Sequence, residues 1–572
     1  MKKFTPTKTA IALAVAFGLS SHAYATNNDI ELLQDGIQNH AEVAQDGSNL
    51  LANALQRGDL NFLQIDQQGG LSFWVLNLGN EAYAEQLGDE NRTTITQDNV
   101  ENEAHAFQVG SFNDTRITQE EAAANFASSD VTGDTNLTII AQLWSAGSDA
   151  MVFVTGDGNS VEVSQWAAAN NAEVVVYGDL NVADIVQAAL GNDAYIYQDG
   201  ASNSAEVEQL GATSDAMLIA VGSTNQQYVG QLGLDHSASS VVVGDNNQTE
   251  QTQFGVNNRS DAAIYGDDNT FTSTQTGTGN SASLLNAVGD ANDVLINQTG
   301  NSNQAGVLGL AGNNNTATFM QSGDGHTGLV GNVDGDNNQF TVNQSDFGHA
   351  FELQPVTGDS NRVIVNQSGE SHFAAHPNSI EGSHNYVSLE QTGSFNDAQF
   401  QVVGDNNAMR LRNLGTNSDM HVFIDGHSND IRTTQYHGDG KEVSVDMMGD
   451  GNQVTALQWH DGARLNISSG GQYSDDNRVD TWQQGRFNSI DLLLTGYGSS
   501  VDIRQEGSAG QGTNSVSGLG GVGGFEMGGE NGVLTIDQFG VHNAVQGMQL
   551  SDNSSINVMQ AGSYNTAVVQ QF

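Results

Sequence analysis

The chain has 572 residues, no cysteine and a formal net charge of −51, with 67 acidic side chains against 16 basic ones. This excess of acid excludes nucleic acid as an expected partner, and the lack of cysteine excludes disulfide bonds as a source of order. Only 3 prolines accompany 67 glycines, which is typical of a backbone whose N–H groups are nearly all hydrogen-bonded.

Residues 1–25 have the pattern of a secretory signal peptide. A basic start up to Lys8 precedes the apolar run Ile11–Leu19, and Ala23–Ala25 form a small-x-small cleavage motif. The apolar run is too short to span a bilayer, and no later stretch is long and apolar enough, so we expect no membrane insertion. The mature chain is predicted to begin at Thr26 and to be exported.

After the signal peptide, the spacing of the asparagines and glutamines divides the chain into regions. Gln45, Gln56 and Gln67 lie 11 residues apart while the asparagines near them are less regular, so 26–79 are interpreted as irregular N-terminal repeats. From residue 80 the register is regular, and we predict one repeat domain over 80–507. A Gly-rich loop is predicted for 508–531, followed by terminal repeats over 532–572.

The most regular part is an array in which asparagine recurs every 22 residues and glutamine follows six residues later. A fixed register over more than a hundred residues indicates a repeat architecture rather than disorder. A looser half-repeat lies 11 residues after some of these asparagines. The array consists of Asn159 with Gln165, Asn181 with Gln187, Asn203 with Gln209, Asn225 with Gln231, Asn247 with Gln253, and Asn269 with Gln275.

Residues 203–209 show how the two faces of one segment differ. The odd positions are Asn203, Ala205, Val207 and Gln209, and the even positions are serine and two glutamates. Period two predicts a strand with one acidic face, and it places the array's amides on the inward face with the small apolar residues.

A buried amide is costly unless it is hydrogen-bonded, and an identical amide one coil away can supply the partner. We therefore predict an all-β fold: a β-solenoid of about 22-residue coils, each with two short strands and two turns, and with internal Asn and Gln ladders. Gly-Asp turns such as Gly156–Gly158 are expected to supply positive φ and local side-chain caps.

The sequence gives little indication of metal binding, cofactor binding or catalysis. The 14 histidines are scattered without a ligand motif and are interpreted as surface residues, so no metal site and no cofactor are predicted. The acids are spread along outward positions and no catalytic motif occurs, so we expect no enzyme. Weak calcium binding by the acidic turns stays open.

The repeats resemble the curlin repeat of curli amyloid fibre subunits: Ser or Asn, five residues, Gln, then Gly-x-x-Asn and a second strand ending in Gln. The ending Ser554–Phe572 is especially similar to a curli subunit's terminal repeat. The chain would be an unusually long member of that family.

The resemblance implies a secreted structural protein on the surface of a Gram-negative bacterium, exported by the curli secretion apparatus. It would self-associate, or associate with other curli subunits, into fibres for adhesion and biofilm matrix. The alternative is a monomeric acidic β-solenoid adhesin that binds calcium.

Overall fold

The computed structural model describes residues 27–69, 79–374, 378–471, 473–507 and 513–572; the expected signal peptide lies outside them. The chain divides into two compact units, Met1–Asn246 and Asn247–Phe572. Within each unit the described residues form parallel β-sheets from coils of about 22 residues, which confirms the predicted all-β solenoid.

In unit 1 the strands alternate between two sheets. The first sheet contains β1 (Asp29–Asp35), β3 (Leu51–Arg57), β5 (Glu81–Leu87), β7 (Glu103–Val109), β9 (Phe126–Thr132), β11 (Asp149–Thr155), β13 (Asn171–Tyr177), β15 (Asp193–Asp199), β17 (Asp215–Val221) and β19 (Ser237–Val243). The second contains β2 (His40–Asp46), β4 (Phe62–Gly69), β6 (Arg92–Val100), β8 (Asp114–Ala123), β10 (Leu137–Leu143), β12 (Ser160–Trp166), β14 (Val182–Gln187), β16 (Ser204–Gln209) and β18 (Gln226–Leu234).

Unit 2 repeats this plan, with some strands split in two. Its first sheet contains β20 (Gln248–Val256), β22 (Thr270–Thr278), β24 (Asp293–Asn301), β27 (Thr316–Asp324), β30 (Gln339–Phe347), β33 (Arg362–Glu370), β36 (Tyr386–Ser394), β38 (Ala408–Asn413), β40 (Asp430–Gln435), β42 (Gln453–Trp459), β44 (Arg478–Gln484), β46 (Ser500–Glu506), β49 (Val533–Val541) and β51 (Ser555–Ser563).

The other sheet of unit 2 contains β21 (Arg259–Tyr265), β23 (Ser281–Val288), β25 (Gln304–Val307), β26 (Leu310–Ala311), β28 (Thr327–Val330), β29 (Val333–Asp334), β31 (Ala350–Leu353), β32 (Val356–Thr357), β34 (Phe373–Ala374), β35 (Ser379–Glu381), β37 (Asp397–Val403), β39 (Asp419–Asp425), β41 (Glu442–Met448), β43 (Arg464–Ser468), β45 (Ser489–Leu494), β47 (Ser515–Ser517), β48 (Phe525–Met527), β50 (Ala544–Gln549) and β52 (Thr566–Gln571). A 3-10 turn, η1 (Leu519–Gly521), precedes β48.

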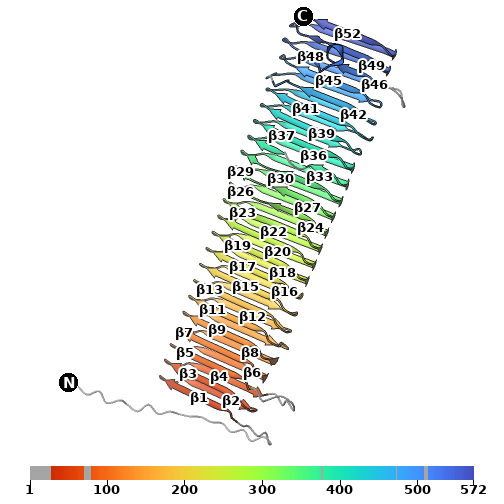
Figure 1. Cartoon of the computed structure of the whole chain (residues 1–572). Helices are drawn as coiled ribbons and strands as arrows, with labels where there is room; N and C mark the ends of the chain where they lie inside the picture. The colour runs from red at the N-terminus through yellow and green to blue at the C-terminus, as the bar shows by residue number, and fades with distance from the viewer. Residues whose placement is uncertain (1–26, 70–78, 375–377, 472, 508–512) are drawn as a thin grey trace, which may run out of the picture. The chain divides into compact units, whose positions relative to one another are not determined.

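Each strand pairs in parallel with the strand one coil away, so equivalent residues lie side by side (Figure 1). Ser160 of β12 pairs with Val182 of β14, and Val182 pairs with Ser204 of β16. Because the register does not shift here, every inward position meets an inward position of the next coil. This is how a 22-residue spacing in sequence becomes a column of identical side chains in space.

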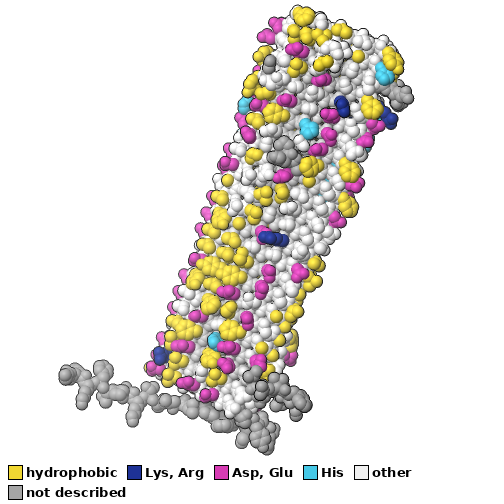
Figure 2. All heavy atoms as spheres, viewed as in Figure 1, with side chains coloured by type: hydrophobic (Ala, Val, Ile, Leu, Met, Phe, Trp, Pro, Cys, Tyr) yellow, Lys and Arg dark blue, Asp and Glu magenta, His cyan; other side chains and the backbone are white. Residues whose placement is uncertain are grey.

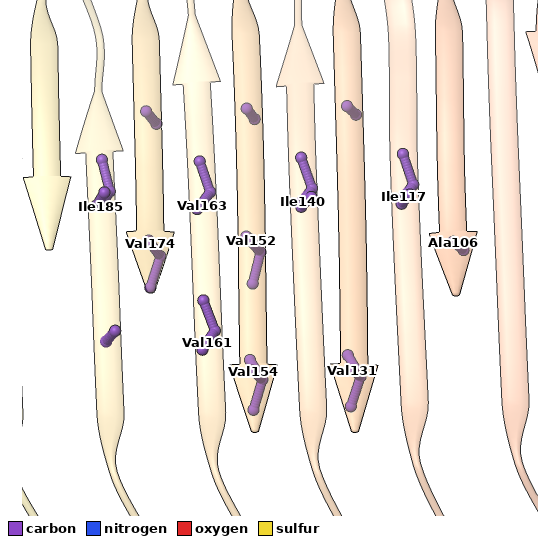
Figure 3. Packing of buried hydrophobic residues seen from close by; sticks show 14 of the residues in the cluster. Ala106, Ile117, Val131, Ile140, Val152, Val154, Val161, Val163, Val174 and Ile185 are labelled. Carbon is purple, nitrogen blue, oxygen red and sulfur yellow. The ribbon is translucent and has the colours of Figure 1, made fainter. Parts of the chain in front are cut away.

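The core between the two sheets is one side chain deep from each sheet. Val152 and Val174 of one sheet face the same interior as Val163 and Ile185 of the other, and all four are fully buried (Figure 3). Valine, isoleucine and alanine alternate with outward polar residues, as in β12 with its burial alternating along the strand. The narrow core leaves no room for large side chains at most positions, which explains the many alanines.

The turns require glycine where coils stack closely. Gly156 has φ 132°, and a Cβ built there would lie 2.0 Å from the carbonyl oxygen of Gly178 in the next coil. No other residue can combine that φ with that approach. Columns of such glycines allow neighbouring turns to approach within hydrogen-bonding distance.

The Gly-rich segment predicted as a loop is broken by two strands. In its described part, β47 pairs with β45 and β50, and β48 also pairs with both of them. The glycines around η1 form a bulge between β47 and β48. Backbone hydrogen bonding to the coils on either side holds this segment in the sheet despite its composition.

Candidate functional site

The glutamines of the array form a continuous chain of side-chain hydrogen bonds in unit 1. The Nε2 of Gln165 donates to Oε1 of Gln187 at 2.9 Å, Gln187 donates to Gln209 at 2.9 Å, and Gln209 donates to Gln231 at 2.9 Å. In unit 2, Gln253 donates to Gln275 at 2.9 Å. All these side chains are at most 2% exposed.

Each glutamine amide also joins the two halves of a coil. Gln187 Nε2 donates to the backbone carbonyl of Asn171 at 3.0 Å and to that of Asn192 at 3.0 Å. Gln209 Nε2 donates in the same way to the carbonyls of Asp193 and Ser214. These glutamines therefore bond along the stack and across the core, which satisfies a polar group that would otherwise be costly to bury.

The asparagines of the array work differently. Asn159 Oδ1 accepts the backbone N–H of Asn181 at 2.9 Å, and Asn159 Nδ2 donates to the carbonyl of Gly178 at 2.8 Å. Asn181 and Asn203 repeat both bonds within unit 1. Asn181 Oδ1 accepts the N–H of Asn203 and Asn203 Oδ1 accepts that of Asn225, while the Nδ2 groups of Asn181 and Asn203 donate to the carbonyls of Gly200 and Gly222. Asn225 Nδ2 donates in the same way to the carbonyl of Gly244.

In unit 2 the same geometry joins Asn247 and Asn269. Asn269 N–H donates to Asn247 Oδ1 at 2.9 Å, and the two Nδ2 groups donate to the carbonyls of Gly266 and Gly289. The sequence suggested amide-to-amide stacking for both residue types. Glutamine follows that scheme, whereas the shorter asparagine chiefly bonds the backbone of the next turn, with direct Asn–Asn contacts of 3.0–3.1 Å only in some coils.

The Gly-Asp turns also cap differently from the expectation. Asp157 Oδ1 accepts the backbone N–H of Asp134 at 2.8 Å, and Asp179 Oδ1 accepts the N–H of Asp157 at 2.8 Å. The expected local cap is therefore wrong at these turns, because the carboxylate reaches the turn of the preceding coil. A column of aspartates then stabilises coil stacking rather than a single turn.

The second corner of each coil, which the sequence showed only as a loose half-repeat, carries a mixed column. In unit 2 it contains Asn280, Asn303, His326, His349, His372, Asn396, Ser418 and Lys441, each buried. The prediction that histidines are surface residues is wrong for His326, His349 and His372, and for His236 of unit 1. Their 23- or 24-residue spacing from Asn303 to Asn396 was the signal that could have placed them.

In these histidines, Nδ1 accepts the backbone N–H of the next coil, as the Oδ1 of Asn303 does. His326 Nδ1 accepts the N–H of His349 at 3.3 Å, and His349 Nδ1 accepts that of His372 at 3.1 Å. His349 Nε2 donates to the carbonyl of Ser345 at 2.6 Å. The rings are neutral in this arrangement, since Nδ1 receives a proton donor and Nε2 carries the hydrogen.

Burial lowers the pKa of all three histidines, and that of His349 falls to about 4. The pKa of His349 includes a smaller lowering by the neighbouring imidazoles, which the carbonyl of Ser345 and the Asp346 carboxylate oppose. The stack is therefore uncharged near neutral pH.

Lys441 occupies the same corner with a fully buried side chain, and its Nζ has no hydrogen-bond partner among the described residues. Burial lowers its pKa to about 8, although Asp461 and Asp439 favour the charged form.

On the outer faces, acids stack above one another. Glu162 of β12 pairs with Asp184 of β14, and Asp184 pairs with Glu206 of β16. Burial, together with the charges of Glu162, Glu206 and Glu208, raises the pKa of Asp184 to about 6. Figure 2 shows acidic side chains spread over the visible surface of both units rather than gathered in one cleft.

The described residues contain no group of three or more histidine, aspartate or glutamate side chains placed to hold a metal ion. Nor do they contain a helix with the length and apolar character to cross a bilayer. The arrangement orders the backbone and leaves acidic strand faces outside.

Parallel sheets with internal ladders define a β-solenoid repeat protein. A sequence model of the Curlin associated repeat matches residues 181–211 and 289–318, one segment in each unit. The chain therefore carries curlin repeats, and the resemblance seen in the sequence is confirmed at these two places. The first segment contains two Asn–Gln pairs, from Asn181 to Gln209. No curated protein matches the chain.

Proposed function

We propose that this chain is a secreted, curli-type amyloid fibre subunit with a structural rather than an enzymatic role, in surface adhesion and biofilm matrix. The observation that carries the proposal is the combination of curlin repeats with glutamine ladders whose hydrogen bonds run along the stack. Such ladders run through successive coils, with an interruption among the described residues at Asn413, and an amide at the edge of a coil can pair with a further coil, so they favour growth by adding coils.

The acidic outer faces fit the same role. Like charges on neighbouring fibres repel, so the faces oppose lateral clumping, while the strand edges of the outermost coils stay available. On this proposal the partners are further copies of the chain or other curli subunits, with export through the curli secretion apparatus from a Gram-negative cell.

The test is assembly of the purified chain from Thr26. Fibres that give a cross-β reflection at about 4.7–4.8 Å, and that form faster when seeded with their own fragments than with unrelated amyloid, are the expected result. A chain that stays monomeric and folds only with added calcium would favour an acidic solenoid adhesin instead. Calcium, and not stacking between copies, would then supply the stability of the fold.

A further inference from the structure

Among the described residues, the first and last coils each lack a neighbouring coil on one side. Within the described residues, β1 and β2 pair only with β3 and β4, and β51 and β52 pair only with β49 and β50. The inward side chains of the first coil are correspondingly open. Ile30 is 49% exposed, whereas Ala52, its partner in β3, is 0% exposed. Four strand edges are therefore unpaired among the described residues, and the core is exposed at the first coil.

The ladders give these ends opposite polarity. Where glutamines pair along the stack, the Nε2 donates toward the coil that follows, as Gln34 does to Gln56 at 2.5 Å and Gln538 to Gln560 at 2.9 Å. The last coil therefore ends in the Nε2 of Gln560, and the first coil begins with the Oε1 of Gln34. A donor at one end faces an acceptor only when the last coil of one copy meets the first coil of another.

The asparagine column has the reverse polarity and leads to the same conclusion. Asn565 N–H donates back to Asn543 Oδ1 at 3.3 Å, and Asn61 N–H donates back to Asn39 Oδ1 at 3.0 Å. The last coil thus presents the Oδ1 of Asn565, while the first presents the N–H of Asn39. Two identical ends brought together would oppose donor to donor and acceptor to acceptor.

Charge distinguishes the ends as well. The outward positions of β1 and β2 carry five acids: Asp29, Glu31, Asp35, Glu42 and Asp46. The sequences of β51 and β52, SINVMQAGS and TAVVQQ, contain none. Like charges directly opposite on neighbouring strands destabilise a sheet, so an uncharged last coil is suited to receive an acidic first coil.

From these observations we infer that copies of this chain join with β51 against the partner's β1 and β52 against the partner's β2. This joint rests on the proposed fibre function and specifies its contact. In this register Ile556 meets the partner's Ile30, Gln560 meets the partner's Gln34, and Asn565 meets the partner's Asn39.

The outward pairs are equally specific. Asn557 lies beside the partner's Glu31, and Val568 lies beside the partner's Glu42. The competing register sets β52 against the partner's β1. It leaves a gap one strand wide beside β51, because the partner's β2 follows β1 by half a coil, and the edge of β51 stays unpaired.

The absence of cysteine from the chain allows a direct test. Four single variants are made in the chain from Thr26: Asn557→Cys, Val568→Cys, Glu31→Cys and Glu42→Cys. All four positions are exposed, so the coils keep their packing, which circular dichroism checks. Variants are mixed in pairs, assembled into fibres and oxidised. Neighbouring strands place equivalent Cα atoms about 4.8 Å apart, within the range for a disulfide of about 4.4–6.8 Å.

We expect mixed dimers from Asn557→Cys with Glu31→Cys and from Val568→Cys with Glu42→Cys, and their loss in the exchanged pairings. Dimers from Val568→Cys with Glu31→Cys would establish the competing register and overturn the inference. Fibres that form without any of these dimers would overturn the joint but not the fibre function. Failure of the unsubstituted chain to form fibres would overturn both.

Discussion

The imidazole rings of His349 and His372 lie parallel, with centroids 4.8 Å apart and planes 8° apart, inside the core corner of unit 2. His326 stacks on the other side of His349 at 5.0 Å. Each Nδ1 accepts a backbone N–H of the next coil, so protonation would replace three acceptors by donors and set like charges within a few ångströms of one another. The column therefore tolerates only neutral rings.

This makes unit 2 acid-sensitive. The pKa of His349 is lowered from 6.5 to about 4 in the fold, so its contribution is fully present above pH 6.5 and is lost as pH falls toward 4. The pKa values of His326 and His372 are lowered as well, and among the described residues the carboxylates that oppose these shifts are Asp324 and Asp346. We expect His349→Asn to lose less stability between pH 7 and pH 5 than the wild type.

Urea unfolding at both pH values, with hydrogen exchange to localise the effect to the coils around His349, measures this. His384→Asn is the matched control, because His384 is exposed in a turn. Equal acid sensitivity in His349→Asn and the wild type would show that another group is responsible.

Asp184 in unit 1 predicts the opposite dependence. Burial and three glutamates raise its pKa from 3.8 to about 6, so its carboxylate is disfavoured in the fold. Stability attributable to this group is present below pH 3.8 and is lost as pH rises through about 6. Asp184→Asn should stabilise unit 1 at pH 7, by less than about 1 kcal/mol since the site is partly exposed, and should have no such effect near pH 3.5.

Chemical denaturation at the two pH values measures the difference, with Asp199→Asn at the exposed end of β15 as the control. A gain for Asp184→Asn that is the same at both pH values would contradict an electrostatic origin.

The regular part of the fold could be predicted because two independent patterns coincide in residues such as Asn203–Gln209. Period two assigns the faces and the 22-residue spacing assigns the neighbours, so strand, burial and stacking follow together. The structure has these strands with the predicted alternation of buried and outward side chains.

The second corner could not be predicted in the same way. Its column passes from Asn303 through His326 to Lys441, residues whose types share no obvious property. What they share is a position: each side chain fills the same corner beside a turn. At this corner a histidine Nδ1 can accept the backbone N–H that an asparagine Oδ1 accepts in other coils. From Asn303 to Asn396 the column is spaced by 23 or 24 residues, because turn length varies there without disturbing the strand register, so the 22-residue period alone does not predict it.

The glutamine ladder should dominate the stability of unit 1. Gln187→Leu removes the acceptor for Gln165 and the donor for Gln209, and leaves two backbone carbonyls without this donor. We expect a loss of about 2–4 kcal/mol, because unsatisfied buried polar groups cost about 1–3 kcal/mol each. Val186→Thr, an outward change next to it in β14, should stay within about 0.5 kcal/mol.

Urea midpoints with m-values measure both variants, since loss of cooperativity between coils would show in the slope. If the two variants were equally stable, the ladder would contribute no more than its outward neighbours, and the stacking of apolar residues alone would hold the coils.

Gly156 and Gly147 allow two reasons for glycine in the turns to be tested separately: a close approach between neighbouring coils, and a positive φ. Gly156 combines φ 132° with a neighbouring carbonyl oxygen 2.0 Å from a built Cβ, whereas Gly147 has φ 64° and nothing within 4 Å of its Cβ. Gly147→Ala should cost about 1–2 kcal/mol, the ordinary penalty of the left-handed region. Gly156→Ala should cost more than about 3 kcal/mol, because the turns of two coils must separate.

Thermal and urea unfolding of both variants measure the difference. Hydrogen exchange should show lost protection at the N–H of Asp157 and Gly178, which bond to the adjacent coils. Equal costs for the two alanines would mean that positive φ alone fixes glycine in these turns. A larger cost at Gly156 would instead show that the spacing between coils selects it, which ties the glycine content of the chain to its stacked architecture.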